Sequence, residues 1–413
     1  MNAVEAEPQK FPRTFYFANA IELLERLAFY GFYIGLSLYL TNVVHMTDVQ
    51  VGFLLGNWRL ASSLAPIVCG ALADRIGFRR SLILAFVLYS IAYGSLLLFP
   101  QKGIAIAALF LAAIGGAFMK PVIMGTVVRT SPAGRQTEGF AIFYRMINSG
   151  SVLGKSLAYV VRRFVALRFV SGTSVIASLL ALGIAIFAYE EPPKEDTANE
   201  REKPGIGEML QGYWTALKDL RFTGFLVVFS GFYFMAEQFY MTFPKYVTRH
   251  IDEKAPLEII TLINPAFIAI GQGFVTRVLR RLEPVTAMSI GLLIASTSML
   301  VMGAFPTIVG ACVSGAIFAV AEMSCSPRFY DTVASFAPSK AKAGLYMGLV
   351  FVPAAIGAWL GGQASGILIA RYLPKDGARA PLTIWSIYAA FGIVCAGGML
   401  LYRTLARPRN DAA

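Results

Sequence analysis

Apolar residues along this chain gather into long blocks that are separated by short polar connections. Each block holds about 20 residues or more, which is enough for a helix to cross a hydrocarbon core about 30 Å thick. The first block is too long for a signal peptide and follows a mixed-charge tail, so we expect it to remain as the first helix. The pattern predicts an all-α integral membrane protein with twelve spanning helices, over residues 15–42, 50–74, 81–100, 103–129, 139–162, 169–189, 221–247, 257–279, 285–305, 307–335, 343–370 and 382–403.

The composition agrees with a membrane protein, because 56% of the 413 residues are hydrophobic and only 15% are charged. Soluble domains carry about one quarter charged residues. The chain has 36 Lys and Arg residues and a net charge of +12. With both termini in the cytoplasm, the cytoplasmic loops hold about twice as many of these cations as the outer loops, as the positive-inside rule requires. We therefore expect a multi-pass protein of the bacterial inner (plasma) membrane with cytoplasmic termini, and no nucleic-acid binding.

A charged stretch interrupts the apolar blocks near the middle of the chain. It predicts a cytoplasmic linker over 190–220, between six-helix bundles over 15–189 and 221–403, with cytoplasmic tails over 1–14 and 404–413. Six helices plus six is the arrangement expected of the major facilitator superfamily, in which substrate binds near the midplane between the bundles. The linker is too short for a soluble catalytic domain.

The connection between the second and third spans, residues 70–80, has the sequence GALADRIGFRR. It resembles the loop signature of that superfamily. Its glycines permit a tight turn, and Asp74, Arg75 and Arg79 are suited to form breakable ion pairs where the protein closes. The alternative is that the cations only retain the loop in the cytoplasm.

Three ionisable residues, Glu22, Glu25 and Arg26, fall within the first span, and Tyr30 and Tyr33 continue the same helix face. A charge at a helix centre costs about 2.5 to 3.5 kcal/mol, so such residues tend to face a cavity or a partner. The stripe therefore marks a candidate working site.

Lys120, before Pro121 in the fourth span, is a further buried charge, and Glu322 lies near the middle of the tenth. A buried ammonium needs a carboxylate, and Glu25, Glu22 or Glu322 are candidates. A midplane carboxylate that is protonated in one state and paired in another would couple proton movement to conformational change.

The fifth span carries Tyr144, Arg145 and Asn148, which are placed to face a cavity. Alternatively, Arg145 anchors at the interface and Gly150 serves helix packing. Polar residues also interrupt later spans, at Glu237, Asn264 and Ser326.

Taken together, these positions resemble the proton-dependent oligopeptide transporter family, a branch of the same superfamily. The resemblance rests on spaced motifs in both halves: Glu22-x-x-Glu25-Arg26 with Phe29-Tyr30-Gly31, Lys120-Pro121, Phe143-Tyr144 with Ile147-Asn148, Glu237-Gln238, Asn264-Pro265, and Glu322 with Ser326-Pro327. It implies proton-driven uptake by alternating access. It also implies that Glu22, Glu25, Arg26 and Lys120 take part in proton coupling, and that Glu322 recognises a peptide amino terminus and takes part in gating.

The chain departs from the family at Tyr33, where peptide-transporting members usually carry a second arginine near the peptide carboxylate. Tyrosine donates one hydrogen bond but has no permanent charge. Arg59, Lys155 and Arg145 are candidate replacements, and a basic cavity would suit a carboxylate-bearing solute. Arg59 has alternatives, namely pairing near Asp48 or snorkelling outward.

Arg328 and Asp331 are spaced for an i,i+3 ion pair at the cytoplasmic end of the tenth span, either as local stabilisation or as part of a gate. The four cysteines lack metal-ligand spacing, so we expect no metal and no cofactor.

The leading hypothesis is a proton-coupled symporter that imports di- and tripeptides or a related small carboxylate-bearing solute, and that works as a monomer in the lipid bilayer. Alternatives are a proton-driven exporter of amphipathic compounds and a nontransporting receptor; an enzyme would need a nucleophile-base set that the sequence lacks. The candidate substrate-binding residues are Tyr30, Tyr33, Arg59, Lys120, Tyr144, Arg145, Asn148, Lys155, Glu237, Asn264, Glu322 and Ser326.

Overall fold

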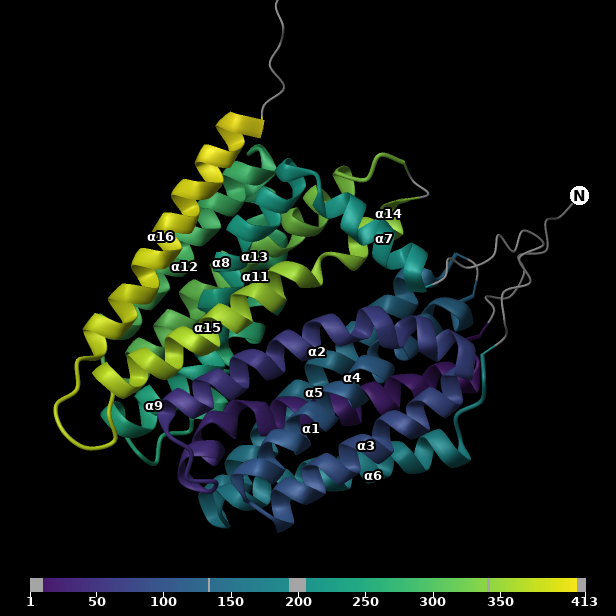
Figure 1. Cartoon of the computed structure of the whole chain (residues 1–413), viewed down its shortest axis with the longest axis horizontal. Helices are drawn as coiled ribbons and strands as arrows, with labels where there is room; N and C mark the ends of the chain where they lie inside the picture. The colour runs from purple at the N-terminus through teal and green to yellow at the C-terminus, as the bar shows by residue number, and fades with distance from the viewer. Residues whose placement is uncertain (1–9, 133, 193–205, 340–341, 407–413) are drawn as a thin grey trace, which may run out of the picture.

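The computed structural model describes residues 10–132, 134–192, 206–339 and 342–406, and the regular structure there is helical (Figure 1). The prediction of an all-α protein is confirmed. The first half contains α1 (Arg13–Asn42), α2 (Asp48–Ile76), α3 (Phe78–Leu98), α4 (Lys102–Thr130), α5 (Gln136–Phe164), the 3-10 turn η1 (Leu167–Phe169) and α6 (Val170–Phe187). The second half contains α8 (Leu220–Met241), α9 (Phe243–Tyr246), the π turn η2 (Val247–Ile251), α10 (Leu257–Ile260), α11 (Ile263–Leu279), α12 (Pro284–Ala304), α13 (Ile308–Ser335), α14 (Ala343–Gly348), α15 (Phe351–Tyr372) and α16 (Pro381–Ala406).

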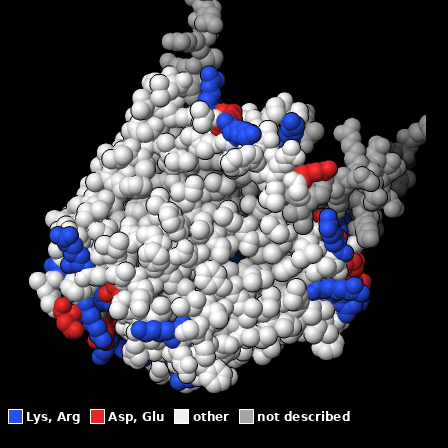
Figure 2. Space-filling model, viewed as in Figure 1, with Lys and Arg blue, Asp and Glu red and all other residues white. Residues whose placement is uncertain are grey.

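Ten helical segments in the described residues are long and apolar enough to cross a membrane. Two further helices of comparable length, α1 with 30 residues and α5 with 29, also contain charged residues. The charges of α1 are mostly buried, and α5 contains Arg145 and the buried Lys155. Figure 2 shows charged residues at the two ends of the visible face and an uncharged band between them. Both helices, α1 and α5, carry candidate site residues, as do α2, α4, α8, α11 and α13.

Three expected spans are interrupted in the structure. The helix expected over 221–247 ends at Met241 and continues as α9 and η2, the one over 257–279 divides into α10 and α11, and the one over 343–370 divides into α14 and α15. Pro244 and Pro353 each lie in the first turn of the helix that follows a break. A proline tolerates that position because its missing N–H would have no helical partner there.

The two halves have separate hydrophobic cores, one built mainly from α1 to α6 and the other mainly from α8 to α16. They meet along α2 and α15, which run side by side (Figure 1). The contact is made by glycines, because a Cβ added at Gly362 would lie 2.5 Å from the backbone nitrogen of Gly56. Small residues allow helix backbones to approach this closely in a membrane. A second glycine contact, Gly154 against Leu27, brings α5 onto α1 and so places Lys155 beside the first helix.

The molecule has two ends. The terminal end is where α1 begins and α16 ends, and the far end is where α1 leads into α2. At the far end, Asp48 pairs with Lys245 at 2.7 Å and with Arg249 at 2.9 Å. Each of these pairs joins the first half to the second. Ion pairs at the terminal end include Asp74–Arg129, which stays within the first half.

A second group of contacts between the halves closes the far end. Arg162, near the end of α5, pairs with Glu258 of α10 at 2.5 Å and also donates to the Ala255 carbonyl at 2.7 Å. Glu258 is almost fully buried. The far end is therefore held closed by two separate groups of charged residues. Of these residues, the sequence analysis named only Asp48, as a possible partner of Arg59.

The expected linker over 190–220 contains a helix that the sequence analysis did not anticipate, α7 (Ile206–Leu217). This helix packs on α14, where Tyr213 contacts Gly348 and Gly212 contacts Leu345 (Figure 1). Most of the charged run of the linker falls within residues 193–205, which lie outside the described residues, as do residues 1–9 and 407–413 of the two expected tails.

Candidate functional site

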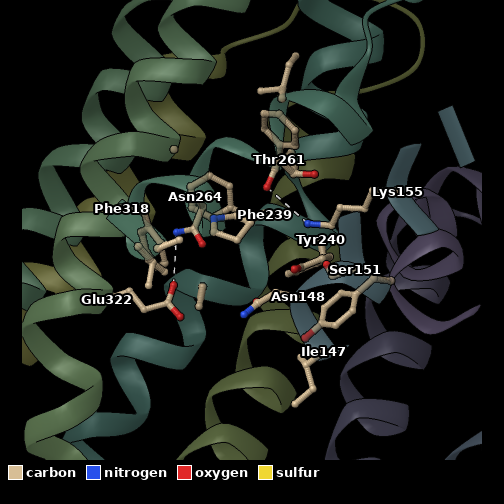
Figure 3. Close-up of a pocket in the computed structure, with 18 of the residues that line it drawn as sticks. Ile147, Asn148, Ser151, Lys155, Phe239, Tyr240, Thr261, Asn264, Phe318 and Glu322 are labelled. Carbon is tan, nitrogen blue, oxygen red and sulfur yellow. Dashed lines mark hydrogen bonds between the residues drawn. The ribbon is translucent and has the colours of Figure 1, made fainter. Parts of the chain in front are cut away.

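A cavity of about 540 Å³ lies between the two halves (Figure 3). We call it the larger cavity. Its volume is in the range of small-molecule sites, about 300 to 1,000 Å³. The first half contributes α1 and α5, and the second contributes α8, α9, α10, α11 and α13. Its polar and aromatic lining residues are Tyr30, Tyr144, Asn148, Ser151, Lys155, Tyr233, Phe239, Tyr240, Phe243, Thr261, Asn264, Phe318 and Glu322.

Only two of the residues that line this cavity are charged, Lys155 and Glu322. The Lys155 side chain is 3% exposed, and its Nζ atom donates to the Thr261 carbonyl at 3.4 Å. The Glu322 carboxylate accepts from Asn264 Nδ2 at 3.3 Å. Figure 3 shows Lys155 and Glu322 on opposite sides of the cavity. Within the described part of the chain, neither has an oppositely charged group within 4 Å.

Aromatic side chains form much of the cavity wall. Lys155 Nζ lies 5.7 Å from the ring centroid of Tyr30 and 5.7 Å from that of Tyr240. Such contacts stabilise a cation weakly, by about 0.5 to 2 kcal/mol. Nearer the terminal end of the cavity, Tyr144 is 62% exposed and Asn148 is also exposed. Since both are on the first half of α5, the cavity is accessible from the terminal end, whereas the far end is fastened.

The α1 acid cluster consists of Glu22, Glu25 and Arg26. Arg26 Nε lies 2.6 Å from Glu22 Oε1 and 3.1 Å from Glu25 Oε2. Tyr89 of α3 donates to the other oxygen of Glu25 at 2.9 Å. The two carboxylates are 1% and 2% exposed. Two buried carboxylates thus share one guanidinium. If both carboxylates are ionised, one negative charge remains to be balanced by another group or by a proton.

Lys120 lies close to this cluster but does not pair with it. Glu25, Arg59 and Lys120 line a smaller cavity of about 20 Å³, which is the space of a single water molecule. In the described residues no carboxylate lies within 4 Å of Lys120. The expected ion pair with Glu22, Glu25 or Glu322 is therefore not formed in this structure. The reason is that Arg26 already binds both carboxylates of α1, and Glu322 lines the other cavity.

Glu237 does not line the larger cavity; it is 6% exposed and is bound by the first half. Arg59 donates to Glu237 Oε1 from Nε at 2.9 Å and from Nη2 at 2.6 Å. Tyr33 donates to the second oxygen at 2.5 Å. Tyr33 and Arg59 therefore act together on one carboxylate. No sequence pattern indicates this, because the three residues are on three different helices.

The structure corrects the alternative that Arg59 pairs near Asp48. Asp48 is bound by Lys245 and Arg249 from the second half, and Arg59 reaches Glu237 instead. It also corrects the expected Arg328–Asp331 ion pair. The buried Arg328 donates back to the Ser324 carbonyl at 3.3 Å, whereas Asp331 is exposed, so the two side chains are not within 4 Å of one another.

Two other candidates lie outside the larger cavity. Arg145 is exposed and donates to the Ala141 carbonyl at 3.3 Å, and Ser326 is half-buried but is not among the residues that line the cavity. The sequence analysis grouped both with the substrate site.

The connection between α2 and α3 is held within the first half. The carboxylate of Glu191 accepts from the backbone nitrogens of Phe78 and Arg79, at 2.6 and 2.9 Å. An anion at a helix N-terminus is favourable because those N–H groups lack helical partners. The Arg79 guanidinium donates to the Ala185 and Ile186 carbonyls at the end of α6. Glu191 was assigned to the linker from the sequence, so this cap was not foreseen.

Comparison with known proteins identifies the class of protein to which this chain belongs. Residues 20–362 match the Major Facilitator Superfamily, and the chain belongs to that superfamily. It is therefore a membrane transporter and not an enzyme.

Three comparisons indicate the range of its relatives. The chain is 22% identical over 395 residues to "Multidrug resistance protein MdtH" of Cronobacter sakazakii (strain ATCC BAA-894), covering 94% of this chain and 92% of that protein. Its fold matches a crystal structure of a POT family transporter in complex with 5-aminolevulinic acid, with a TM-score of 0.76, 18% identity, and coverage of 96% and 97%. It also matches a structure of the nucleoside transporter NupG, with a TM-score of 0.80, 14% identity, and coverage of 94% and 99%.

Proposed function

We propose that this transporter is a proton-coupled symporter that imports a small carboxylate-bearing organic solute, such as a di- or tripeptide, by alternating access. It works as a monomer in the inner membrane of a bacterium, and both termini are cytoplasmic. The terminal end is then the cytoplasmic end and the far end faces outward. In this orientation the structure has an inward-accessible cavity with a fastened outer side.

The observation that carries the proposal is the α1 acid cluster, in which Glu22 and Glu25 share Arg26. Two carboxylates and one guanidinium leave an excess negative charge in a buried site, and this excess favours binding of a proton or an approach of Lys120. The proton and Lys120 compete for the same carboxylates, so a carboxylate that carries the proton does not attract Lys120, and one that has lost it does. Proton binding to the α1 acid cluster would in this way change the attraction between α1 and α4, which carries Lys120.

The energetics are adequate for accumulation of a solute. Each charge that moves down a 100 mV potential contributes about 2.3 kcal/mol, before any pH gradient is counted. A second coupling group is Glu322, whose only hydrogen bond in the described residues comes from Asn264. The fold neighbours include a POT family transporter in complex with 5-aminolevulinic acid, which agrees with a small organic solute as the cargo.

Reconstituted vesicles with an internal pH dye test the proposal. Under an inward proton gradient, dipeptides and non-peptide carboxylates are added in turn, and we expect at least one to accelerate proton entry. Glu25→Gln should abolish that acceleration, whereas Glu253→Gln, at an exposed site of the far end, should leave it unchanged. Solute binding without any proton flux would contradict the proposal and favour a receptor.

A second candidate is proton-driven export of an amphipathic compound. It is favoured by the similarity to a multidrug resistance protein and by the aromatic wall of the larger cavity. The two functions differ in the direction of coupling. An exporter would drive solute against the direction of proton movement, so reversing the imposed gradient in the same vesicles distinguishes them.

A further inference from the structure

The linker helix α7, which lies beside α14 (Figure 1), presents two large apolar side chains on its surface. Leu210 and Trp214 are one turn apart on it, and they are 50% and 64% exposed. From their position we propose that α7 lies on the surface of the membrane, with these two side chains in the interfacial layer and with Lys218 and Arg221 at anionic lipid headgroups. The inference goes beyond the proposed function, because it requires neither a particular solute nor proton coupling.

One side of α7 is fixed against the second half. Tyr213 contacts Gly348 of α14, and Ala216 is only 4% exposed. At about 100° per residue, Leu210 and Trp214 follow Tyr213 around the helix, next to this packed side. The apolar sector of α7 is therefore wider than the part of it that α14 covers.

The rest of the helix circumference is polar, since Glu208, Gln211, Thr215 and Lys218 are exposed there. A helix with one apolar and one polar side can lie in the plane of the membrane interface, with its apolar side at the boundary between headgroups and acyl chains. Tryptophan favours this layer because its ring is apolar and its N–H is polar. The division of α7 into two sides therefore matches that of an interfacial helix.

The exposed edge of α7 is close in the chain to a surface that faces lipid. Leu220, at the start of α8, is 84% exposed, and Val227, two turns later on the same face, is 51% exposed. Neither side chain lines the larger or the smaller cavity. Because α8 is long and apolar enough to cross a membrane, these side chains face acyl chains. The lipid contact that we assign to α7 thus continues the one that α8 makes.

Two cations lie at the junction of α7 and α8, where headgroups would be. Lys218 and Arg221 are exposed, and in the described residues neither has a carboxylate within 4 Å. Asp219 lies between them, but its carboxylate caps α8 by accepting from the backbone nitrogens of Arg221 at 2.8 Å and Phe222 at 3.4 Å. Cations beside a spanning helix attract anionic headgroups. Lys218 and Arg221 are therefore available to lipid phosphates.

Spin labels on single cysteines test the position of α7. Leu210→Cys and Gln211→Cys, at adjacent exposed residues, are labelled in a cysteine-free background and placed in nanodiscs of phosphatidylglycerol. We expect the label at 210 to collide more with oxygen, which concentrates in lipid, than with a water-soluble nickel chelate, and the label at 211 to show the reverse. Equal access of the nickel chelate to both labels would overturn the proposal. A label at 210 that is shielded from both reagents would also overturn it, since protein would then cover this side of α7.

A substitution at Trp214 tests the anchor itself. Trp214→Gln should shift the label at 210 toward water, so that its preference for oxygen is lost. Thr215→Gln, on the polar side of the same turn, is the matched control and should leave the label where it is. An unchanged label in Trp214→Gln would refute the anchor. If Trp214→Gln does not fold, the comparison of the labels at 210 and 211 decides.

Lipid composition tests the headgroup site. The label at 210 should lie deeper in phosphatidylglycerol than in phosphatidylcholine, and Lys218→Gln/Arg221→Gln should remove this difference. Arg280→Gln/Arg281→Gln, at two exposed cations that follow α11, is the matched control and should retain it. Equal depth in the two lipids would refute the site for anionic headgroups.

Discussion

Tyr33 of α1 donates its hydroxyl hydrogen to Glu237 of α8 over 2.5 Å, and thereby connects the two halves of the transporter. Arg59 of α2 binds the same carboxylate. Glu237 is thus held in a buried position by two helices of the opposite half. Any state in which the halves separate here must break these contacts.

Tyr33→Phe should weaken this link between the halves. Removing the hydroxyl leaves one Glu237 oxygen without its hydrogen bond, which costs about 1 to 3 kcal/mol. The distance distribution between spin labels on the two halves should broaden or shift. Tyr39→Phe is the matched control, since the Tyr39 hydroxyl donates to the Leu96 carbonyl within the first half. It should lower thermal stability without changing the distribution; an identical shift in both variants would contradict the assignment.

Arg59→Gln should be strongly destabilising. It leaves the buried Glu237 without its cation, and breaking one side of a buried ion pair costs about 3 to 5 kcal/mol. Thermal unfolding in detergent measures the loss. The double variant Arg59→Gln/Glu237→Gln should recover much of it, because no unpaired charge remains. If the double variant is as unstable as the sum of the single variants, the two side chains do not interact in the way described.

Asp48→Asn should release the far end. The substitution removes the carboxylate charge that Lys245 and Arg249 share, and leaves two cations from the second half close together. In a cysteine-free background, single cysteines at the far end should then be labelled faster by a water-soluble maleimide. Asp252→Asn, at an exposed aspartate of the same end, is the control. Unchanged labelling in Asp48→Asn would show that other contacts keep this end closed.

Gly362→Ala should disturb the contact between α2 and α15. The added methyl group would lie 2.5 Å from the backbone nitrogen of Gly56, so the helices must move apart. Overpacking of this kind costs about 1 to 3 kcal/mol. Thermal unfolding gives the magnitude. A Cβ at Gly183 of α6 would meet no atom within 4 Å, so Gly183→Ala should be nearly neutral. Equal stability of both variants would argue against the tight contact.

The fold can be predicted from the sequence because the features that indicate it lie within short stretches of the chain. Apolar blocks of membrane length and a charged interruption are enough to place the long helices in two halves, and the α1 motif points to Glu22, Glu25 and Arg26. The breaks within helices were missed, since a proline in the first turn of one helix can look like part of a longer span.

The pairing of the charges is not local, and the sequence analysis was less successful there. Arg59 was given three possible roles, but only the folded chain brings it to Glu237, which is 178 residues away. Likewise, Arg328 and Asp331 have the correct spacing for an ion pair, yet burial of Arg328 turns it toward the Ser324 carbonyl. Spacing along one helix indicates which side chains can meet, and the packing of neighbouring helices decides which of them do.

The most direct measurement compares two kinds of transport by the Glu25→Gln protein in vesicles: accumulation of a solute driven by an imposed proton gradient, and exchange of the same solute at equal pH. If the α1 acid cluster couples proton movement to transport, the variant should lose gradient-driven accumulation while it retains exchange. Wild-type levels of gradient-driven accumulation in Glu25→Gln would contradict the account.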